Sequence, residues 1–404
     1  MAVFVANLEK IKQEIVGYIE NKRQNYIETS HQIHENPEIG NEEFFASALL
    51  SDTLECEGFE VTRNVAGHET AFLARKKSSL GGPAIAFLAE YDALPNIGHA
   101  CGHNIIGTTS TAAAIALSKV IEETGGEVVV FGTPAEEGGP NGSAKGSFVK
   151  HNLLEGIDAA LMIHPSGETA ITGSSLAVDP LDFEFHGKPA HAAEAPHEGI
   201  NALDAVIQLF NGINALRQHV TDDVRIHGII THGGDAPNIV PHYAKARFYI
   251  RAQTRTKLNE VTRKIKAIAE GAALATGAEV RVIAFQNQVD NLILNRRFDE
   301  VAKNTLESLG EEVVVDERAG LGSTDAGNIS QIVPTIHPYI KIGPSDLVAH
   351  TDAFREAAKS NRGDEALITG AKALALTSLE LIVNKELLTG IKAEFLERKQ
   401  KENN

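Results

Sequence analysis

Short apolar runs alternate with helical stretches in the first part of the chain. Residues 84–92 form an apolar run that ends in polar residues and predicts a buried strand, and 105–123 predicts a helix rich in small residues. Apolar runs within 125–139 and 156–165 predict two further strands, the first of which leads into a glycine-rich loop. Strands that alternate with helices predict an α/β domain with a mostly parallel sheet and helices on both of its faces.

The pattern changes near residue 181. A strand, a helix, two strands, a helix and a strand are predicted in turn, over 181–187, 199–218, 224–234, 244–254, 257–277 and 279–286. This β-α-β-β-α-β order is that of a ferredoxin-like α+β unit. A helix at 296–310 and a strand at 311–317 then resume the alternation of helices and strands seen in the first part of the chain. The ferredoxin-like unit is therefore predicted to be an insertion in the first domain. We therefore predict a core domain of residues 1–178 and 291–404 and an inserted domain of residues 179–290.

The chain begins with an amphipathic pattern. Leu8, Ile11, Ile15 and Ile19 recur at helical spacing and predict one apolar stripe on a helix. Charged residues follow the first apolar positions too soon for a secretory signal peptide. No apolar run is expected to reach the roughly 18 residues that a membrane span needs. We therefore expect no membrane association.

Composition narrows the choice of partners and compartment. The chain of 404 residues has 54 acidic and 37 basic side chains, which gives a net charge of −17 at pH 7. Nucleic acids and anionic membranes bind basic surfaces, so neither is expected as a partner. Cys56 and Cys101 are the only cysteines. This excludes a disulfide framework and predicts a reducing, cytoplasmic location.

Polar residues follow each of the buried strands predicted in the first part of the chain. Asp92 follows the first strand, Glu136 and Glu137 follow the second, and His164 follows the third. Ligands of parallel sheets bind at the carboxyl ends of the strands, so these side chains predict the position of a site. The carboxylate of Asp92 could form a hydrogen bond to a metal ligand and so fix its orientation, without binding the metal itself.

Cys101 and His103 are two residues apart in a loop that contains glycine. Side chains at alternate positions of an extended loop point the same way, so both could bind one ion. The alternatives are a packed thiol beside a hydrogen-bonded histidine, and a nucleophilic thiol. The adjacent Glu136 and Glu137 favour the ion, because metal-assisted hydrolysis needs one carboxylate as ligand and another free as general base.

Other catalytic motifs are absent from the sequence. There is no G-x-S-x-G nucleophile elbow, no G-x-x-x-x-G-K-[ST] phosphate loop, no G-x-G-x-x-G fingerprint and no C-x-x-C pair. A papain-like role for Cys101 would leave the paired glutamates unexplained. His350 begins the last helical segment and predicts nothing by itself.

Nine motifs, in order along nearly the whole chain, resemble the zinc amidohydrolase and exopeptidase family that includes aminoacylase and the glutamate carboxypeptidases. The resemblance is closest to the branch of p-aminobenzoyl-glutamate hydrolase subunits and aminoacylase-like dipeptidases. The motifs lie at residues 34–43, 89–104, 132–139, 162–165, 187–193, 199–205, 233–241, 322–330 and 337–351.

The resemblance implies roles for individual residues. The implied metal ligands are Cys101, His103, Glu137, His164 and His350, with Glu136 as general acid/base and Asp92 as the carboxylate behind the ligands. His191 matches the histidine that reaches another subunit's active site, and Asn238 matches an asparagine that contacts substrate. Many relatives have His-x-Asp where this chain has Glu90-Tyr91-Asp92. Cys101 and His103 are expected to substitute for that missing imidazole.

The resemblance also implies the fold and the reaction. The expected fold is a zinc-exopeptidase-like core with an inserted ferredoxin-like dimerisation lid. The expected activity is hydrolysis of amide bonds in N-acyl amino acids or small peptides that carry a free carboxylate. The expected cofactor is zinc, two ions per subunit, with manganese or cobalt as alternatives. The expected assembly is a homodimer or a higher even-numbered oligomer. The alternatives are a non-catalytic binding protein on the same scaffold and a hydrolase that uses the Cys101 thiol.

Overall fold

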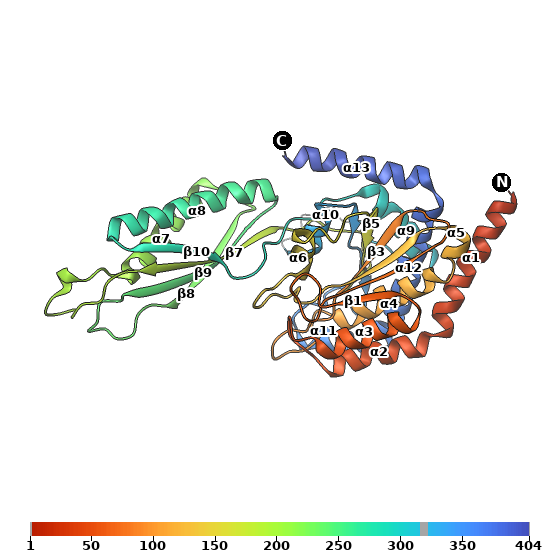
Figure 1. Cartoon of the computed structure of the whole chain (residues 1–404), viewed down its shortest axis with the longest axis horizontal. Helices are drawn as coiled ribbons and strands as arrows, with labels where there is room; N and C mark the ends of the chain where they lie inside the picture. Colours follow the sequence, from red (N-terminus) through yellow and green to blue (C-terminus); the bar gives the residue numbers. More distant parts are fainter. Residues whose placement is uncertain (1, 316–321, 404) are drawn as a thin grey trace. The chain divides into compact units, whose positions relative to one another are not determined.

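The computed structural model describes residues 2–315 and 322–403, and it divides into two compact units. The first unit contains Met1–Ser174 and Leu292–Asn404, and the second contains Ser175–Asn291 (Figure 1). The sequence places the insertion at 179–290, and the second unit of the structure begins and ends within a few residues of those positions.

The first unit is built on a six-stranded sheet with the order β1-β2-β4-β3-β5-β11. The pairings of β3 with β4, β3 with β5, and β5 with β11 are parallel, whereas β1 with β2 and β2 with β4 are antiparallel. This confirms the predicted mostly parallel core. The strands are β1 (Glu60–Arg63), β2 (Phe72–Lys77), β3 (Ala84–Ala89), β4 (Glu127–Gly132), β5 (Ala159–Leu161) and β11 (Thr335–Ile336).

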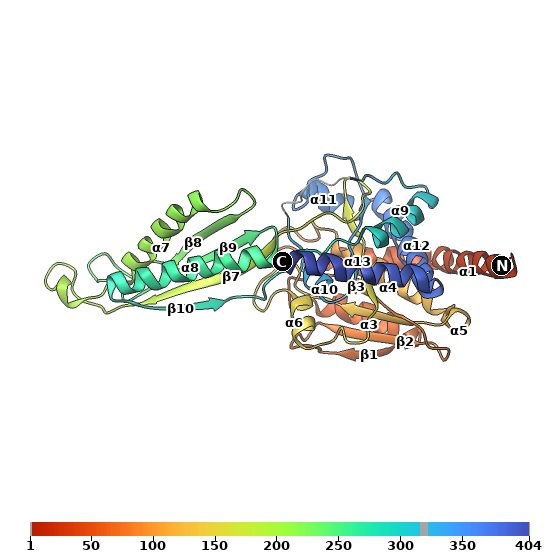
Figure 2. The same ribbon diagram turned by 90° about the horizontal axis from the view of Figure 1, so that it is seen from above.

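Helices cover this sheet (Figure 2), and separate hydrophobic cores form on its two faces. They are α1 (Ala2–Asn21), α2 (Arg23–Glu35), α3 (Phe44–Cys56), α4 (His103–Ser118), α5 (Ile121–Thr124), α6 (Ala144–Lys150), α9 (Arg296–Ser308), α10 (Ala326–Ser330), α11 (Asp352–Ala357), α12 (Asn361–Val383) and α13 (Lys385–Asn403). The predicted stripe of α1 is buried at Ile11, Ile15 and Ile19, and Leu8 packs against the same core.

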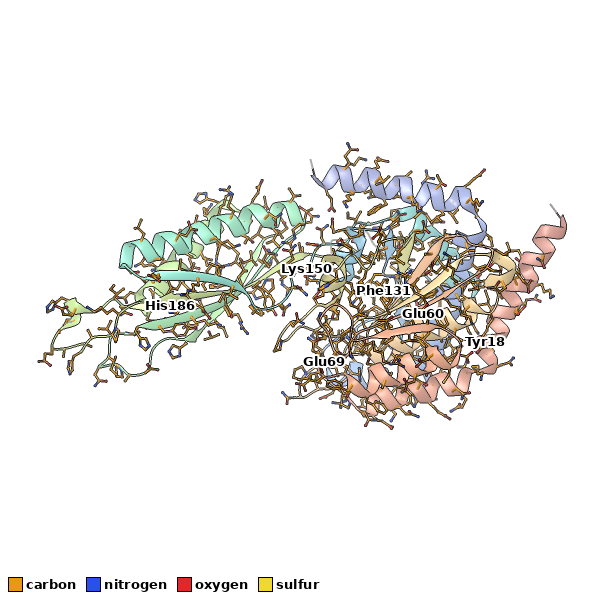
Figure 3. All side chains as sticks on the ribbon, viewed as in Figure 1. Tyr18, Glu60, Glu69, Phe131, Lys150 and His186 are labelled. Carbon is orange, nitrogen blue, oxygen red and sulfur yellow. The ribbon has the colours of Figure 1, made fainter. Side chains whose placement is uncertain are left out.

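The central strands of this sheet contribute side chains to both cores, because successive side chains of a strand point to opposite faces. In β3, Ile85 and Phe87 belong to the core under α4 and α12, whereas Ala86 and Leu88 belong to the other core. Phe131 of β4 lies among the buried side chains of that second core (Figure 3). Burial on both faces explains why these strands read as continuous apolar runs.

The second unit has the predicted ferredoxin-like order. Its elements are β7 (Ala177–His186), α7 (Ala202–Leu216), β8 (Arg225–His232), β9 (Tyr243–Ala252), α8 (Arg255–Thr276) and β10 (Glu279–Ala284), with short 3₁₀ turns at Pro196–Glu198 and Arg217–His219. The strands form an antiparallel sheet in the order β10-β7-β9-β8, and α7 and α8 pack on one face through a separate hydrophobic core.

Two sequence predictions need correction. The single strand expected in 156–165 is two strands, because the segment leaves β5 and continues as β6 (His164–Ser166), which pairs with β12 (Tyr339–Lys341) in a separate sheet. Pro338 separates β11 from β12, and a proline has no N–H for the ladder. The expected strand 311–317 is only an isolated bridge at Val314 within 311–315. Its last residues, 316 and 317, lie outside the described part of the chain.

One helix does reach the length and hydropathy of a membrane span, contrary to the sequence expectation. Asn361–Val383 has an 18-residue window with a mean hydropathy of 1.6. This window is 78% buried inside the protein, and α12 packs against α4 as a core helix. This helix thus meets the length and hydropathy criteria of a membrane span, but most of its apolar window is covered by the rest of the protein.

Gly107 allows α4 to approach the end of β3. A Cβ atom at this position would lie 2.6 Å from the carbonyl oxygen of Glu90 and 2.9 Å from a methyl group of Leu50. Glu90 is the first residue after β3, at the edge of the sheet where the candidate side chains lie. The missing side chain therefore sets the distance between this helix and the site.

We predict that Gly107→Ala destabilises the protein by about 1–3 kcal/mol, because the new methyl group meets backbone that cannot rotate away. Gly17→Ala in α1 is the matched control, since a Cβ there meets no atom of the described residues within 4 Å. That change should stabilise by about 0.5–1 kcal/mol through helix propensity. Denaturant unfolding of both variants measures the difference, and equal effects would contradict the close approach.

Candidate metal centre

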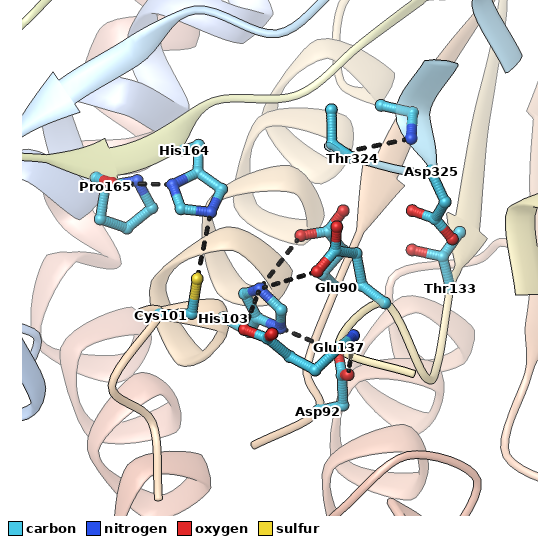
Figure 4. Close-up of polar contacts among 12 residues, drawn as sticks. Glu90, Asp92, Cys101, His103, Thr133, Glu137, His164, Pro165, Thr324 and Asp325 are labelled. Carbon is cyan, nitrogen blue, oxygen red and sulfur yellow. Dashed lines mark hydrogen bonds and ion pairs between the residues drawn. The ribbon is translucent and has the colours of Figure 1, made fainter. Parts of the chain in front are cut away.

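The loops at the carboxyl ends of β3, β4 and β5 bring together side chains that the sequence singled out, and Figure 4 shows Asp92, Glu137 and His164 among them. Asp92 follows β3, Glu136 and Glu137 follow β4, and His164 follows β5. Cys101 and His103 lie at the start of α4, and His350 lies shortly before α11. These residues form one cluster in the first unit.

Asp92 organises the centre of this cluster. Its Oδ1 accepts a hydrogen bond from Nδ1 of His103 at 2.8 Å, and its Oδ2 accepts one from the backbone N–H of Glu137 at 2.9 Å. The second nitrogen of His103, Nε2, is buried and has no hydrogen-bond partner in the part of the chain that the structure describes. A carboxylate that holds one nitrogen of a histidine leaves the other free as a metal ligand. Burial disfavours protonation of His103, but Asp92 outweighs this and raises its pKa.

Cys101 and His164 face each other across the cluster. The Sγ atom of Cys101 lies 3.7 Å from Nε2 of His164, whose Nδ1 donates to the carbonyl of Pro165 at 2.7 Å. Gly102 adopts a φ of +76°, and a Cβ there would lie 2.8 Å from Cγ of Pro165. A glycine is therefore required between Cys101 and His103, because the backbone turn and the neighbouring proline leave no room for a side chain.

Glu137 and His350 form the more exposed side of the cluster. The Oε1 atom of Glu137 lies 3.4 Å from Nε2 of His350, whose side chain is 56% exposed. The N–H of His350 donates to the carbonyl of Ala100, which ties this loop to the one that carries Cys101. Burial opposes ionisation of Glu137, but contacts with His350 and His103 outweigh it and lower its pKa.

Glu136 is adjacent in sequence to Glu137 and behaves differently. Burial and the carboxylates of Glu90 and Glu137 raise its pKa well above the ordinary value. The loop that presents it is held by Glu43, a buried side chain whose Oε1 accepts the N–H of Ala135 at 2.8 Å. Ala135 has a φ of +60°, so this contact fixes a turn that an alanine rarely adopts.

The donor set fits a metal ion. Within the described residues, four groups of potential ligands have their donor atoms within 4.8 Å of one another. They are Cys101/His103/His164, Cys101/Glu137/His350, His103/Glu136/Glu137 and Glu90/Glu136/Asp325. In the first three groups, Nε2 of His103 and Oε1 of Glu137 are buried and make no hydrogen bond within the described residues, so they are the kind of atoms that a cation would satisfy. Thiolate, imidazole and carboxylate donors together are typical of zinc sites.

The two remaining predicted residues belong to the second unit. The Nδ1 atom of His191 accepts from the N–H groups of Ala193 and Glu194 at 3.3 and 3.1 Å. The neutral ring therefore carries its proton on Nε2. The carbonyl of Asn238 accepts the N–H of Ala192 at 3.0 Å, and the side chain of Asn238 is exposed. The roles of both residues stay predictions.

Sequence reasoning missed a buried ion-pair triad beside the cluster. The Nζ atom of Lys145 lies 2.6 Å from Oε1 of Glu90 and 2.6 Å from Oδ1 of Asp325. Burial raises the pKa of a carboxyl group, but the Lys145 ammonium outweighs it and lowers the pKa of Glu90 to about 2. The position where many relatives have an imidazole is thus occupied by a carboxylate engaged with lysine. Asp325 lies in one of the nine motifs, which was the only signal available.

A second missed residue is His337, which is buried and stacks on His164 with ring centroids 5.3 Å apart. Neither ring nitrogen has a hydrogen-bond partner among the described residues, and burial lowers the pKa of His337 to about 3. A neutral ring against His164 fixes the plane of a predicted ligand. Its motif, 337–351, was noted in the sequence for other residues.

The environment of Cys101 argues against a nucleophilic thiol. Burial and the carboxylate of Glu137 raise the pKa of this thiol in the protein alone. A nucleophilic cysteine needs the opposite shift, toward the thiolate at neutral pH. A bound cation supplies that shift, because a coordinating thiol is deprotonated.

The mostly parallel sheet, with a cluster of donors at its strand ends and a further carboxylate beside them, defines a metal-dependent amidohydrolase or peptidase. Residues 181–276 match the family profile described as "Peptidase dimerisation domain". Over 98% of its length the chain is 36% identical to "Xaa-Arg dipeptidase" of Mus musculus, and the match covers 95% of that protein. The chain belongs to the M20 family of peptidases.

Further relatives agree with this assignment. The chain is 36% identical over 75% of its length to one of the subunits of p-aminobenzoyl-glutamate hydrolase from Escherichia coli, covering 66% of that protein. Its fold is similar to that of a Klebsiella pneumoniae aminobenzoyl-glutamate utilization protein, with a TM-score of 0.71 at 18% identity over 90% of this chain and 97% of that one. A dinuclear metal-binding M20 peptidase of Bacillus subtilis gives a TM-score of 0.65 at 21% identity, over 90% and 99%.

We predict that Cys101→Ser lowers bound metal and activity together, because a hydroxyl is a poor substitute for a thiolate. Removal of a group that only hydrogen-bonds to a metal ligand lowers metal affinity by roughly 10- to 100-fold, and loss of the ligand itself should cost more. Cys56→Ser, which changes an exposed cysteine in the same unit, is the matched control and should be neutral. Metal analysis of both variants after dialysis tests this, and an unchanged metal content in Cys101→Ser would make Cys101 a packing residue.

Proposed function

We propose that this hydrolase acts on N-acyl amino acids or small peptides and cleaves an amide bond next to a free carboxylate, with zinc as its metal. The relatives named as an Xaa-Arg dipeptidase and a p-aminobenzoyl-glutamate hydrolase support this class of substrate. The three donor types of the cluster support zinc, with manganese or cobalt as alternatives. Two groups of ligands share Cys101, which supports two ions per chain.

The observation that carries the proposal is that the adjacent carboxylates of Glu136 and Glu137 have different environments. Glu137 is held by Asp92 through its backbone and lies against His350 and His103. Both carboxylates lie 3.9 Å from Nε2 of His103. Burial and the neighbouring carboxylates of Glu90 and Glu137 raise the pKa of Glu136, whereas burial of Glu137 is outweighed by contacts with His350 and His103, which lower its pKa. Glu137 is therefore suited to bind a cation, and Glu136 is suited to hold a proton beside it.

The residues suggest the course of the reaction. Cys101, His103, Glu137, His164 and His350 would hold the metal, which would supply Lewis acidity and lower the pKa of water. Glu136 takes the proton of the attacking water as the water oxygen bonds to the amide carbon. The Nε2–H of His191 is available to donate to the developing oxyanion. Glu136 then gives the proton to the departing amine, and the C–N bond breaks.

A substrate panel with metal control tests this function. The purified protein should hydrolyse some members of a set of N-acyl amino acids and dipeptides, and not their carboxamides. Chelation should abolish the activity, and added zinc should restore it. Activity that survives complete removal of metal would contradict the proposal. Equal activity on the carboxamides would contradict the requirement for a free carboxylate.

We predict that Glu136→Gln lowers turnover by at least about 100-fold, because the amide keeps the shape of the side chain but cannot accept a proton. Metal content should remain near that of the unchanged protein. Glu137→Gln is the matched control, one residue away, and should lose metal. The opposite result, with metal lost only from Glu136→Gln, would exchange the two roles.

The proposal extends to a homodimer formed through the second unit. Strand β8 is at one edge of the antiparallel sheet, and the side chains of Ile229 and Ile230 on it are 63% and 44% exposed. An exposed apolar edge strand pairs readily with a second copy of itself around a two-fold axis. The match of residues 181–276 to a dimerisation domain supports the same assembly. The scarcity of cysteines supports a cytoplasmic location.

We predict that His191 acts in the site of the other protomer of the dimer. Glu136→Gln and His191→Ala should each be inactive alone, and a mixture that exchanges protomers should recover activity. One of the two sites in each mixed dimer then has both an intact Glu136 and an intact His191. The activity of the mixture, measured after exchange is verified with labelled protomers, tests this.

Two controls define the outcome of this mixing experiment. A mixture of Glu136→Gln with Glu137→Gln should stay inactive, because both changes lie in the same unit and leave no complete site. His197→Ala, at another exposed histidine of the second unit, should be active alone. Verified exchange without recovered activity refutes the role of His191, and an active monomer refutes the dimer.

A further inference from the structure

The buried triad around Lys145 contains two carboxyl groups and one ammonium. Lys145 in α6 lies between Glu90 and Asp325, and the side chains of all three are at most 1% exposed. Each carboxylate uses one oxygen for the ammonium, at 2.6 Å. Among the described residues, the other oxygens, Oε2 of Glu90 and Oδ2 of Asp325, are buried without a hydrogen-bond partner, and Oε2 of Glu90 lies 3.5 Å from Nε2 of His103. One ammonium thus faces two carboxylates, and each has a second oxygen that makes no hydrogen bond within the described residues.

Glu136 connects this triad to the metal cluster. Its carboxylate belongs to one group of potential ligands with Glu90 and Asp325, and to another with His103 and Glu137. Within each group the donor atoms lie within 4.8 Å of one another. Three carboxylates that meet in this way are a ligand set for a hard divalent cation such as Ca²⁺. An ion bound there would take Glu136 as a ligand and withdraw it from proton transfer.

We propose that the ammonium of Lys145 takes the place of a cation among Glu90, Asp325 and Glu136, and thereby keeps an additional metal ion out and Glu136 free. A lysine suits this role because its compact charge is attached to the chain and cannot exchange with ions in solution. Its burial excludes contact with substrate. Lys145 is therefore a positioning residue that acts through Glu136. This inference rests on the proposed function for the role of Glu136.

The experiment uses the full-length, zinc-loaded protein and its Lys145→Met variant, which keeps a long apolar side chain without the charge. Removal of the ammonium leaves the buried carboxylate of Asp325 without its cationic partner and Glu90 with only the imidazole of His103, which favours uptake of a hard cation. We expect the variant to bind about one more Ca²⁺ per chain than the unchanged protein by equilibrium dialysis and metal analysis. Ca²⁺ should also raise the melting temperature of the variant and inhibit it, without either effect on the unchanged protein.

Matched variants separate this role from a general loss of packing. Lys150→Met, at the exposed end of the same helix, should bind no additional Ca²⁺. Adding Glu90→Gln and Asp325→Asn to Lys145→Met should abolish the additional Ca²⁺ binding, because the amides remove the charges that attract it. If Lys145→Met folds only when Ca²⁺ is present, the inference is supported.

Two results overturn the inference. One is equal Ca²⁺ binding by Lys145→Met and the unchanged protein. The other is a Lys145→Met variant that fails to fold even with Ca²⁺ while the triple variant folds, since a cation then cannot replace the ammonium. The zinc content of the unchanged protein tests the proposed function separately. A protein that holds no zinc and needs no metal would refute that function whatever Lys145→Met does.

Discussion

The candidate site depends on the Asp92 carboxylate, because both of its oxygens are engaged by other parts of the site. One accepts from the ring of His103 and the other from the backbone of Glu137. Three segments, the end of β3, the start of α4 and the loop after β4, are thereby held at fixed distances. Hydrogen bonds to an ionised carboxylate are stronger than those between neutral groups, so two of them fix the position of this buried side chain. The other donors are arranged around that fixed centre.

The sequence allowed the fold and much of the cluster to be predicted for one reason. Parallel strands share a polarity, so residues that follow their carboxyl ends meet at one edge of the sheet. Asp92, Glu137 and His164 could be placed together from this rule alone. Cys101 and His103 could be paired because they are neighbours in sequence. His350 could not be placed without the resemblance to a family, since its contact with Glu137 depends on loops far apart in the chain.

The parts that sequence did not reveal depend on distant contacts. Lys145 binds partners 55 and 180 residues away, and its local sequence has no pattern that marks a buried lysine. The segment 311–317 has the β-branched residues of a strand, but in 311–315 it finds a partner only at Val314, which bridges Ala170. Whether a segment with strand-forming residues becomes a strand depends on a neighbouring strand with which it can pair, and composition does not reveal that neighbour.

The insertion also determines when each unit can form during synthesis. The second unit is one continuous stretch, Ser175–Asn291, whereas the first is completed only by residues that follow it. Strand β11, which pairs with β5, and the side chains of Asp325 and His350 all come after the insertion. On a ribosome, the whole sequence of the second unit therefore emerges while the edge of the larger sheet is still missing. The cluster can be completed only late in synthesis, after the segment carrying His350 has emerged.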